Sequence, residues 1–330
     1  MASQTQQPPL DWFTIGWVCA IDVEFEAALR MLDENFGQPK YLPEGESNAY
    51  CLGRIDDHFV VVTLLAECGT IEAASSLADM ARTFASSLRF ALMVGVAGGI
   101  PLPPDRDVRL GDIVIGHPVG SLPGTVHYGR GKETNEGYQR TGTLNKPPGM
   151  LTATARMIKS DIGPRKHQYM VHFDKALEGD EEAREQYRRP QQDRLFRAEY
   201  VHPSGERDCA KCAPEEEVVV RGARTSTRPR IHLGTVVSGN MVVKNAALRD
   251  EIGRTIEGAL CVEMSAAGLM QKLPCFVVRG ICDYADSHKN NAWEPYAALV
   301  AASFAKELIL RLPIRQEESG DVQQSNLDQS

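Results

Sequence analysis

The stretch Cys275–Asp286 (CFVVRGICDYAD) constrains the fold of this chain more than any other. Five of the seven residues from Cys275 to Ile281 are apolar, and such a near-continuous apolar run is typical of a buried strand in a parallel sheet. Asp283 follows at the carboxyl end of this predicted strand. Because ligands of open α/β sheets bind beyond the carboxyl ends of the strands, Asp283 is either a site residue or the cap of the next turn.

Further apolar runs and helical periodicities predict an α/β fold. A hairpin is expected around Asp56-Asp57, and amphipathic spacing predicts helices over 71–87 and 292–312. Other strands are expected at Phe13–Ile21, Phe90–Val96, Val108–Val119, Ile231–Ser238 and Ala259–Met264.

The segment between about 122 and 230 lacks this periodicity. We interpret it as an insertion that forms a lid or rim, with helix candidates only at Thr152–Lys159 and Asp174–Tyr187. The predicted organisation is one domain over 11–313 that contains this insertion. Residues 1–10 and 314–330 are polar, and we expect both to be disordered.

Composition excludes several classes of partner. A net charge of −8 argues against a nucleic acid as partner. No apolar run approaches the roughly 20 residues that span a bilayer, and the N-terminus does not resemble a signal peptide. Most of the eight cysteines lie in apolar stretches and are interpreted as buried thiols. We therefore expect a cytoplasmic protein that binds no membrane.

Two further motifs can be explained either by a binding site or by ordinary local structure. Gly95-Val96-Ala97-Gly98-Gly99 closes a strand and would let a ligand approach the backbone, although taken alone the motif is better explained by a plain turn. Cys209-x-x-Cys212, with His202 nearby, is half of a zinc motif. Because no second pair stands at a usable spacing, we expect a free surface pair and no metal or other cofactor.

Glu24 changes the interpretation of Asp283. It follows the first predicted strand, at the same edge of the sheet, within an acidic helix start. Cleavage of a sugar–base bond uses two such carboxyl groups, one to protonate the leaving group and one to activate water. The pair therefore predicts a glycosidic-bond chemistry that neither residue indicates alone.

At this point the chain resembles the nucleoside phosphorylase and nucleosidase superfamily, and the insertion is similar to that of fungal members. The resemblance implies a three-layer fold with a mixed, mostly parallel central sheet flanked by helices. The motifs that carry it are Cys19-Ala20-Ile21-x-x-Glu24, Gly95-Val96-Ala97-Gly98-Gly99, Gly111-Asp112-Ile113-Val114, Val237-Ser238-Gly239-Asn240, Val262-Glu263-Met264 and Arg279-Gly280-Ile281-Cys282-Asp283.

The resemblance also implies roles for the site residues. Asp283 would protonate N7 of a purine, and Glu24, with Arg279 close by, would hold or activate the attacking water. The remaining substrate-binding positions would be Ala97, Gly98, Asn240, Val243, Glu263, Met264 and Ser265, with Val243 at the base and Met264 against the ribose.

Two departures from the family pattern matter. Where phosphorylases carry an Arg and a Ser or Thr that touch phosphate, this chain has Met93 and Val96, which favours water over phosphate as the nucleophile. Ser265 replaces a Glu that grips the ribose hydroxyls, and a serine grips a hydroxyl less strongly.

The leading prediction is a purine nucleoside hydrolase that acts on adenosine, inosine or guanosine, in a homodimer by analogy with the family. The alternatives are a phosphate-dependent purine nucleoside phosphorylase and a catalytically weak nucleoside-binding or signalling domain. Fungal members occur alone and at the front of receptors, and because no ATPase domain follows here we expect a stand-alone enzyme.

Overall fold

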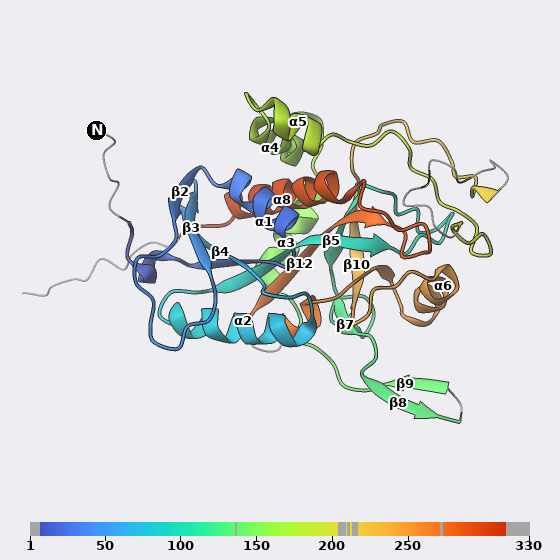
Figure 1. The fold of residues 1–330 in the computed structure, drawn as a ribbon, viewed down its shortest axis with the longest axis horizontal. Helices are drawn as coiled ribbons and strands as arrows, with labels where there is room; N and C mark the ends of the chain where they lie inside the picture. Colours follow the sequence, from blue (N-terminus) through green and yellow to red (C-terminus); the bar gives the residue numbers. More distant parts are fainter. Residues whose placement is uncertain are drawn as a thin grey trace, which may run out of the picture.

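The computed structural model describes residues 7–135, 137–203, 209, 212, 217–270 and 273–314. Its frame is a ten-stranded sheet in the order β11-β10-β6-β12-β5-β1-β4-β3-β2, with β7 also paired to β10 (Figure 1). The strands of this sheet are β1 (Ile15–Cys19), β2 (Glu34–Gly37), β3 (Tyr50–Ile55), β4 (His58–Leu64), β5 (Phe90–Gly99), β6 (Ile113–Gly116), β7 (Thr125–His127), β10 (Ile231–Ser238), β11 (Ala259–Glu263) and β12 (Cys275–Asp283). A separate ribbon, β8 (Gly131–Thr134) with β9 (Gly137–Arg140), projects from the body (Figure 1).

The sheet is mixed, as the sequence predicts. At its centre β12, β5, β1 and β4 are parallel neighbours. The narrower expectation of a mostly parallel sheet is too strong, because β6 runs antiparallel to β12, β11 pairs antiparallel with β5, and β2 and β3 form an antiparallel edge. A two-residue connection such as Asp56-Asp57 can join only antiparallel strands, so the predicted hairpin itself requires part of this departure.

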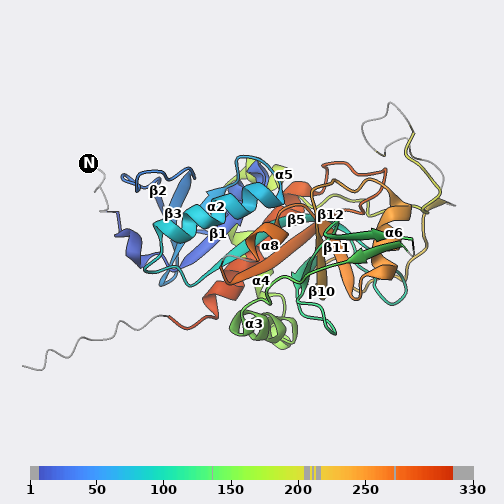
Figure 2. The ribbon, with the colours of Figure 1, turned by 90° about the horizontal axis from the view of Figure 1, so that it is seen from below.

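Helices cover both faces of the sheet and give it three layers (Figure 1). In β5, Leu92 and Val94 point into the core shared with α1, α3, α4 and α8, whereas Ala91 and Met93 point into the core shared with α2 and α7. This alternation is the period of two that an extended strand imposes. Figure 2, seen from below, shows α2 lying across its face. The helices are α1 (Asp22–Met31), α2 (Thr70–Thr83), α3 (Gly149–Lys159), α4 (Gln168–Ala176), α5 (Glu181–Gln186), α6 (Ala246–Thr255), α7 (Ala266–Leu269) and α8 (Glu294–Leu310).

The first half of the predicted insertion belongs to the helical layer. Tyr169 and Phe173 on α4 are buried, with ring centroids 6.2 Å from Phe304 and 5.4 Å from Tyr296 on α8. The lid interpretation is therefore wrong for α3 to α5. Their apolar residues are too sparse to show in the sequence that these helices pack against the core. The single charged helix expected over Asp174–Tyr187 is also wrong, because Gly179 (φ 79°) lies in a break between α4 and α5.

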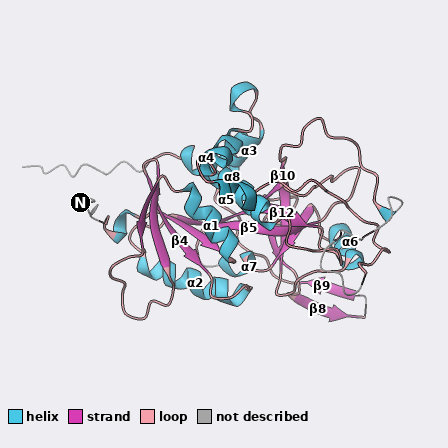
Figure 3. Cartoon of the chain, turned by 45° about the horizontal axis from the view of Figure 1, so that its top comes forward, coloured by secondary structure: helices cyan, strands magenta, loops and turns pink. Residues whose placement is uncertain are grey.

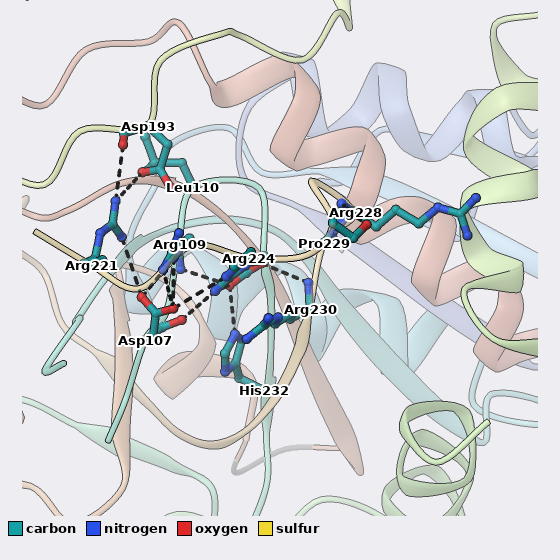
Figure 4. A network of polar contacts seen from close by, with 12 residues as sticks. Asp107, Arg109, Leu110, Asp193, Arg221, Arg224, Arg228, Pro229, Arg230 and His232 are labelled. Atoms are coloured by element: carbon teal, nitrogen blue, oxygen red, sulfur yellow. Dashed lines mark hydrogen bonds and ion pairs between the residues drawn. The ribbon is translucent and has the colours of Figure 1, made fainter. Parts of the chain in front are cut away.

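In the second half of the insertion, the described residues 188–203 and 217–230 are mostly loop (Figure 3) and are tied down by ion pairs. Arg221 lies 3.0 Å from Asp193 within this segment and 3.9 Å from Asp107 outside it. Arg224 lies 2.7 Å from Asp112, whose carboxylate is buried. Figure 4 shows that both Arg221 and Arg224 also contact Asp107. These pairs fasten the loop to the connection before β6.

The chain termini fall partly outside the described residues. The predicted disorder of residues 1–6 and 315–330 lies there and stays a prediction. Gln7, in contrast, donates hydrogen bonds to the carbonyl oxygens of Phe36 and Gln38 at 3.2 and 2.9 Å, which attaches residues 7–10 to β2. In the part of the chain that the structure describes, no helix has the length and apolar character of a membrane span.

Candidate active site

A cavity of about 160 Å³ opens where the carboxyl ends of β1, β5 and β12 meet. It is the place that the sequence predicts for a ligand in a sheet of this kind. Nine of the ten residues that the sequence predicts for the site line it: Glu24, Ala97, Gly98, Val243, Glu263, Met264, Ser265, Arg279 and Asp283.

Glu24 is held at the floor of the cavity by backbone donors. Its Oε2 accepts a hydrogen bond from the N–H of Ala20, and its Oε1 accepts one from the N–H of Val96, both at 2.7 Å. Burial raises the pKa of Glu24, and the charge of Arg279 and the backbone donors only partly offset that effect. A carboxylate held in this way is oriented and is more basic than an exposed glutamate.

Two of the three glycines of β5 make room for the two carboxyl groups. A Cβ at position 95 would lie 2.0 Å from Oε1 of Glu24 and 2.6 Å from Nη1 of Arg279. A Cβ at position 98 would lie 2.7 Å from Oδ1 of Asp283. The glycine-rich motif is therefore not a simple turn. It is the end of a strand whose missing side chains let both carboxyl groups approach the backbone.

Arg279 bridges two acidic side chains beneath the cavity. Its Nη2 forms an ion pair with Oε2 of Glu263, and its Nη1 lies 3.9 Å from Oε1 of Glu24. Burial alone would lower the pKa of Arg279, but these two carboxylates more than offset that and raise it. Glu263 also accepts hydrogen bonds from the N–H groups of Ser265 and Ala266 at 3.0 and 3.1 Å. Glu263 therefore positions Arg279 and the start of α7.

Asp283 has a partner that the sequence argument missed. Its Oδ1 accepts a hydrogen bond from the N–H of Ala285 at 2.7 Å, and its Oδ2 forms an ion pair with Nζ of Lys289. Burial would lower the pKa of Lys289, but the charge of Asp283 outweighs burial and raises it. Lys289 lies six residues beyond Asp283, in a stretch without periodicity, so no sequence pattern indicated it. Glu294 and Cys282 also line the cavity and were missed.

Asn240 is not brought into this cavity. Its Oδ1 accepts hydrogen bonds from the N–H and the hydroxyl of Thr70, at 3.0 and 2.9 Å, at the first turn of α2. Asn240 borders a neighbouring cavity instead. That cavity shares Val243 and Glu263 with the first one, and the predicted role of Asn240 in substrate binding stays a prediction. An amide that follows a strand is equally suited to satisfy the N–H groups at the start of a helix.

A model of the phosphorylase superfamily matches residues 14–311, which is nearly the whole described chain. The chain belongs to the phosphorylase superfamily. A fungal nucleotide-binding leucine-rich repeat (NLR)-like protein of Hyaloscypha variabilis is 41% identical over 310 residues, which cover 93% of this chain and 30% of that protein. The ATP nucleosidase Cap17 of Escherichia coli is 33% identical over 73 residues, which cover 21% of this chain and 14% of that protein. This phosphorylase-superfamily chain thus spans less than a third of the length of these curated relatives.

Solved structures agree on the superfamily fold. Futalosine hydrolase of Helicobacter pylori superposes with a TM-score of 0.58 and 16% identity, over 91% of this chain and 99% of that one. The 5'-methylthioadenosine/S-adenosylhomocysteine nucleosidases of Helicobacter pylori and Neisseria meningitidis superpose with TM-scores of 0.57, at 15% and 18% identity and the same coverage. At these identities the likeness concerns the fold alone.

Two positions separate this superfamily member from the phosphate-binding pattern. Met93 is fully buried in the core under α2 and does not line the cavity, and Val96 presents an apolar side chain to it. The cationic side chains that do line the cavity, Arg279 and Lys289, each contact a carboxylate.

The rim of the site includes part of the insertion, as the sequence predicts. A second cavity adjoins the first and shares Cys282 and Asp283 with it. Its other wall comes from Pro190 to Phe196 in the insertion, together with Cys209. Tyr284, directly after Asp283, links the two walls through a hydrogen bond to Asp193.

Proposed function

We propose that this chain hydrolyses the N-glycosidic bond of purine ribonucleosides such as adenosine, inosine and guanosine, releasing base and ribose. The observation that carries the proposal is that Glu24 and Asp283 reach one cavity from the ends of two parallel strands that flank β5. Two carboxyl groups across a cavity suit a reaction in which the sugar becomes oxocarbenium-like as the base departs.

In this proposal Glu24 orients and activates the water. Each of its oxygens accepts one backbone hydrogen bond, which leaves further lone pairs available to accept a hydrogen bond from water. Its raised pKa makes proton abstraction more favourable than for an exposed carboxylate. The fixed negative charge would also stabilise the positive charge that develops on the sugar ring.

Asp283 is proposed to deliver a proton to N7 of the leaving purine. Its Oδ1 is fixed by the N–H of Ala285, so the side chain has a defined orientation. The ion pair with Lys289 places an ammonium against Oδ2. We propose that a proton of this ammonium passes through Asp283 to N7 as the departing base becomes more basic, and that Lys289 then regains a proton from solvent. Proton transfer of this kind contributes typically about 10²–10⁴-fold to a rate.

Water is favoured over phosphate because the cavity offers no uncompensated positive charge among the described residues. Arg279 is paired with Glu263 and Lys289 with Asp283, and Glu24 adds a negative charge to the floor. A doubly charged anion that enters such a site loses hydration without a matching cation.

The test is release of base from adenosine in phosphate-free buffer and in buffer with added phosphate. We expect equal rates and free ribose as the sugar product. A strong dependence on phosphate, with ribose 1-phosphate as the product, would show that the chain is a phosphorylase.

A second candidate is a catalytically weak nucleoside-binding or signalling module. It is supported by Ser265, which places a short neutral side chain at the cavity wall, and by the NLR-like relative, of which this chain matches 30%. Because the Escherichia coli relative is named an ATP nucleosidase, ATP should be assayed as a substrate together with adenosine. Saturable binding of adenosine or ATP, without release of base on the timescale of hours, would favour this candidate over the hydrolase.

The homodimer expected from the resemblance is likewise a proposal. Met241 and Val242 line the cavity and are 62% and 51% exposed, so they present apolar surface that a second copy would cover. Light scattering on the purified chain would give the mass of a dimer, and the mass of a monomer at all concentrations would refute it.

A further inference from the structure

Three potential metal ligands from the insertion lie together beside the active site. One ligand atom each from His202, Cys209 and Cys212 lies within 4.8 Å of the other two. Two thiolates bound to one tetrahedral zinc ion, at about 2.3 Å each, are ~3.8 Å apart. The cluster is therefore already close to the spacing that a single zinc ion requires.

Hydrogen bonds connect the backbones of Cys209 and Cys212. The N–H of Cys212 donates a hydrogen bond to the carbonyl oxygen of Cys209 at 3.2 Å. The guanidinium of Arg194 donates hydrogen bonds to the same carbonyl and to that of Cys212. These contacts hold the two cysteines close together and so reduce the ordering that metal binding would otherwise require.

One ring nitrogen of His202 contacts a backbone carbonyl, as is common in metal-bound histidines. Its Nδ1 lies 3.0 Å from the carbonyl oxygen of Pro203. Because a carbonyl can only accept, Nδ1 carries the proton in this contact, and in the neutral ring the lone pair is then on Nε2. A hydrogen bond from the other ring nitrogen to a backbone carbonyl fixes the tautomer of metal-bound histidines.

An independent observation comes from His288, on the loop after β12. The side chain is 7% exposed, and neither ring nitrogen has a hydrogen-bond partner, with Oδ1 of Asp286 at 3.8 Å from Nδ1. Its ring centroid is 4.0 Å from that of Phe196 and 5.3 Å from that of His202, and its carbonyl oxygen lies 3.6 Å from Sγ of Cys209. A buried imidazole without a partner is unfavourable unless another group satisfies it.

We propose that His202, Cys209 and Cys212 bind one Zn²⁺ and that His288 takes the fourth position. Two thiols and two imidazoles are a ligand set that zinc prefers, and four protein ligands make the site structural. Binding replaces the two thiol protons, which leave to solvent, and involves no change of oxidation state. The sequence shows only three candidate ligands and therefore favoured a free cysteine pair, whereas the fold places His288, 76 residues beyond Cys212, beside His202 and Cys209.

The zinc ion would fasten the insertion to the loop that supports the active site. His288 directly precedes Lys289, whose ammonium contacts Asp283. The other three ligands belong to the insertion, whose residues 190–196 line the adjoining cavity. The metal would thus lie outside the reaction and order the wall against which Asp283 and Lys289 are placed.

The experiment measures the metal content of the full chain, purified without a histidine tag and without added metal. We expect about one zinc ion per chain. Replacing zinc with Co²⁺ should give the visible absorption of a tetrahedral cobalt ion, with the charge-transfer band of thiolate ligands. Cys209→Ser, Cys212→Ser and His202→Ala should each retain less than about a tenth of the zinc, and His288→Ala should weaken binding roughly 10–100-fold. Cys68→Ser, an exposed cysteine outside the cluster, serves as the control and should retain it.

Three results would overturn the proposal. One is folded wild-type chain that lacks zinc and takes up neither added Zn²⁺ nor Co²⁺. Another is a Cys209–Cys212 disulfide in chain purified under reducing conditions. The third is unchanged zinc content in the Cys209→Ser variant. If the ligand variants do not fold, the cobalt spectrum of the wild-type chain decides, because it reports thiolate ligation directly. Since none of these measurements depends on turnover, their outcome is separate from that of the proposed hydrolysis.

Discussion

Replacing Asp283 with asparagine removes the proposed general acid and leaves the shape of the side chain almost unchanged. The amide oxygen can still accept the hydrogen bond from the N–H of Ala285, which is 2.7 Å long in the native protein. The amide cannot donate an acidic proton to N7 of a purine. We therefore expect kcat for base release to fall about 10²–10⁴-fold, which corresponds to about 2.7–5.4 kcal/mol of transition-state stabilisation.

The same substitution should also lower stability, by an amount that the surroundings of Lys289 determine. Its ammonium loses the carboxylate of Asp283 but keeps Glu294, whose Oε1 lies 3.9 Å away. The Lys289 side chain is 20% exposed, so water can replace part of the lost interaction. We expect the free energy of unfolding to fall by ~1–3 kcal/mol, below the loss for breaking a fully buried pair.

The assay follows base release from adenosine by ultraviolet absorbance and unfolding by denaturant titration. Asp286→Asn is the matched control, because Asp286 is a nearby buried carboxylate paired with Arg249 that does not line the first cavity. The control should lose stability and keep kcat within a few-fold. An Asp283→Asn variant with near-normal kcat, or equal losses of kcat in both variants, would refute the role of Asp283 as acid.

Three more predictions concern the same cavity. Because the pKa of Glu24 is raised above the usual 4.5, kcat/KM should begin to fall on acidification at a pH above 4.5. The contribution of Glu24 to the free energy of unfolding has the opposite pH dependence and decreases as the pH rises through the raised pKa. A kcat/KM profile with its acid limb at or below pH 4.5 would contradict this. Gly95→Ala should reduce kcat about 10²-fold or more, because its Cβ would displace Glu24, whereas Gly149→Ala, with open space around it, should be neutral in the same assay. Ser265→Glu should raise kcat/KM for adenosine more than for 2'-deoxyadenosine, by adding charge-assisted bonds of about 1.5–3 kcal/mol each; a lower kcat/KM for both would mean that another residue binds the ribose.

Sequence patterns were sufficient to predict a site residue where its position follows from the strand that precedes it. Asp283 and Glu24 each stand at or just beyond the end of an apolar run, and parallel strands bring such ends to one edge of the sheet. Lys289 could not be predicted in this way, because its contact with Asp283 depends on the path of an irregular loop. Nor does the sequence show which of two nearby groups, the cavity or the start of α2, the short amide of Asn240 faces.

The insertion illustrates a second reason for failure. A helix that is rich in apolar residues can be predicted from the sequence, as in α8, where 14 of 17 residues are buried. In α4 only Tyr169 and Phe173 are buried, and two aromatic residues in a charged segment are too few to establish a period. Their contacts with α8 come from the tertiary fold, which the local sequence does not encode.

The division of the insertion into two halves has a consequence for how such a site can diversify. The buried residues of α3 and α4 pack against the core, so substitutions there affect folding. Residues 190–192, Arg194 and Phe196 instead line a cavity that reaches Asp283, and the loop is secured separately by Arg221 and Arg224. Substitutions in this outer wall can therefore reshape the cavity while the sheet and helices beneath stay in place.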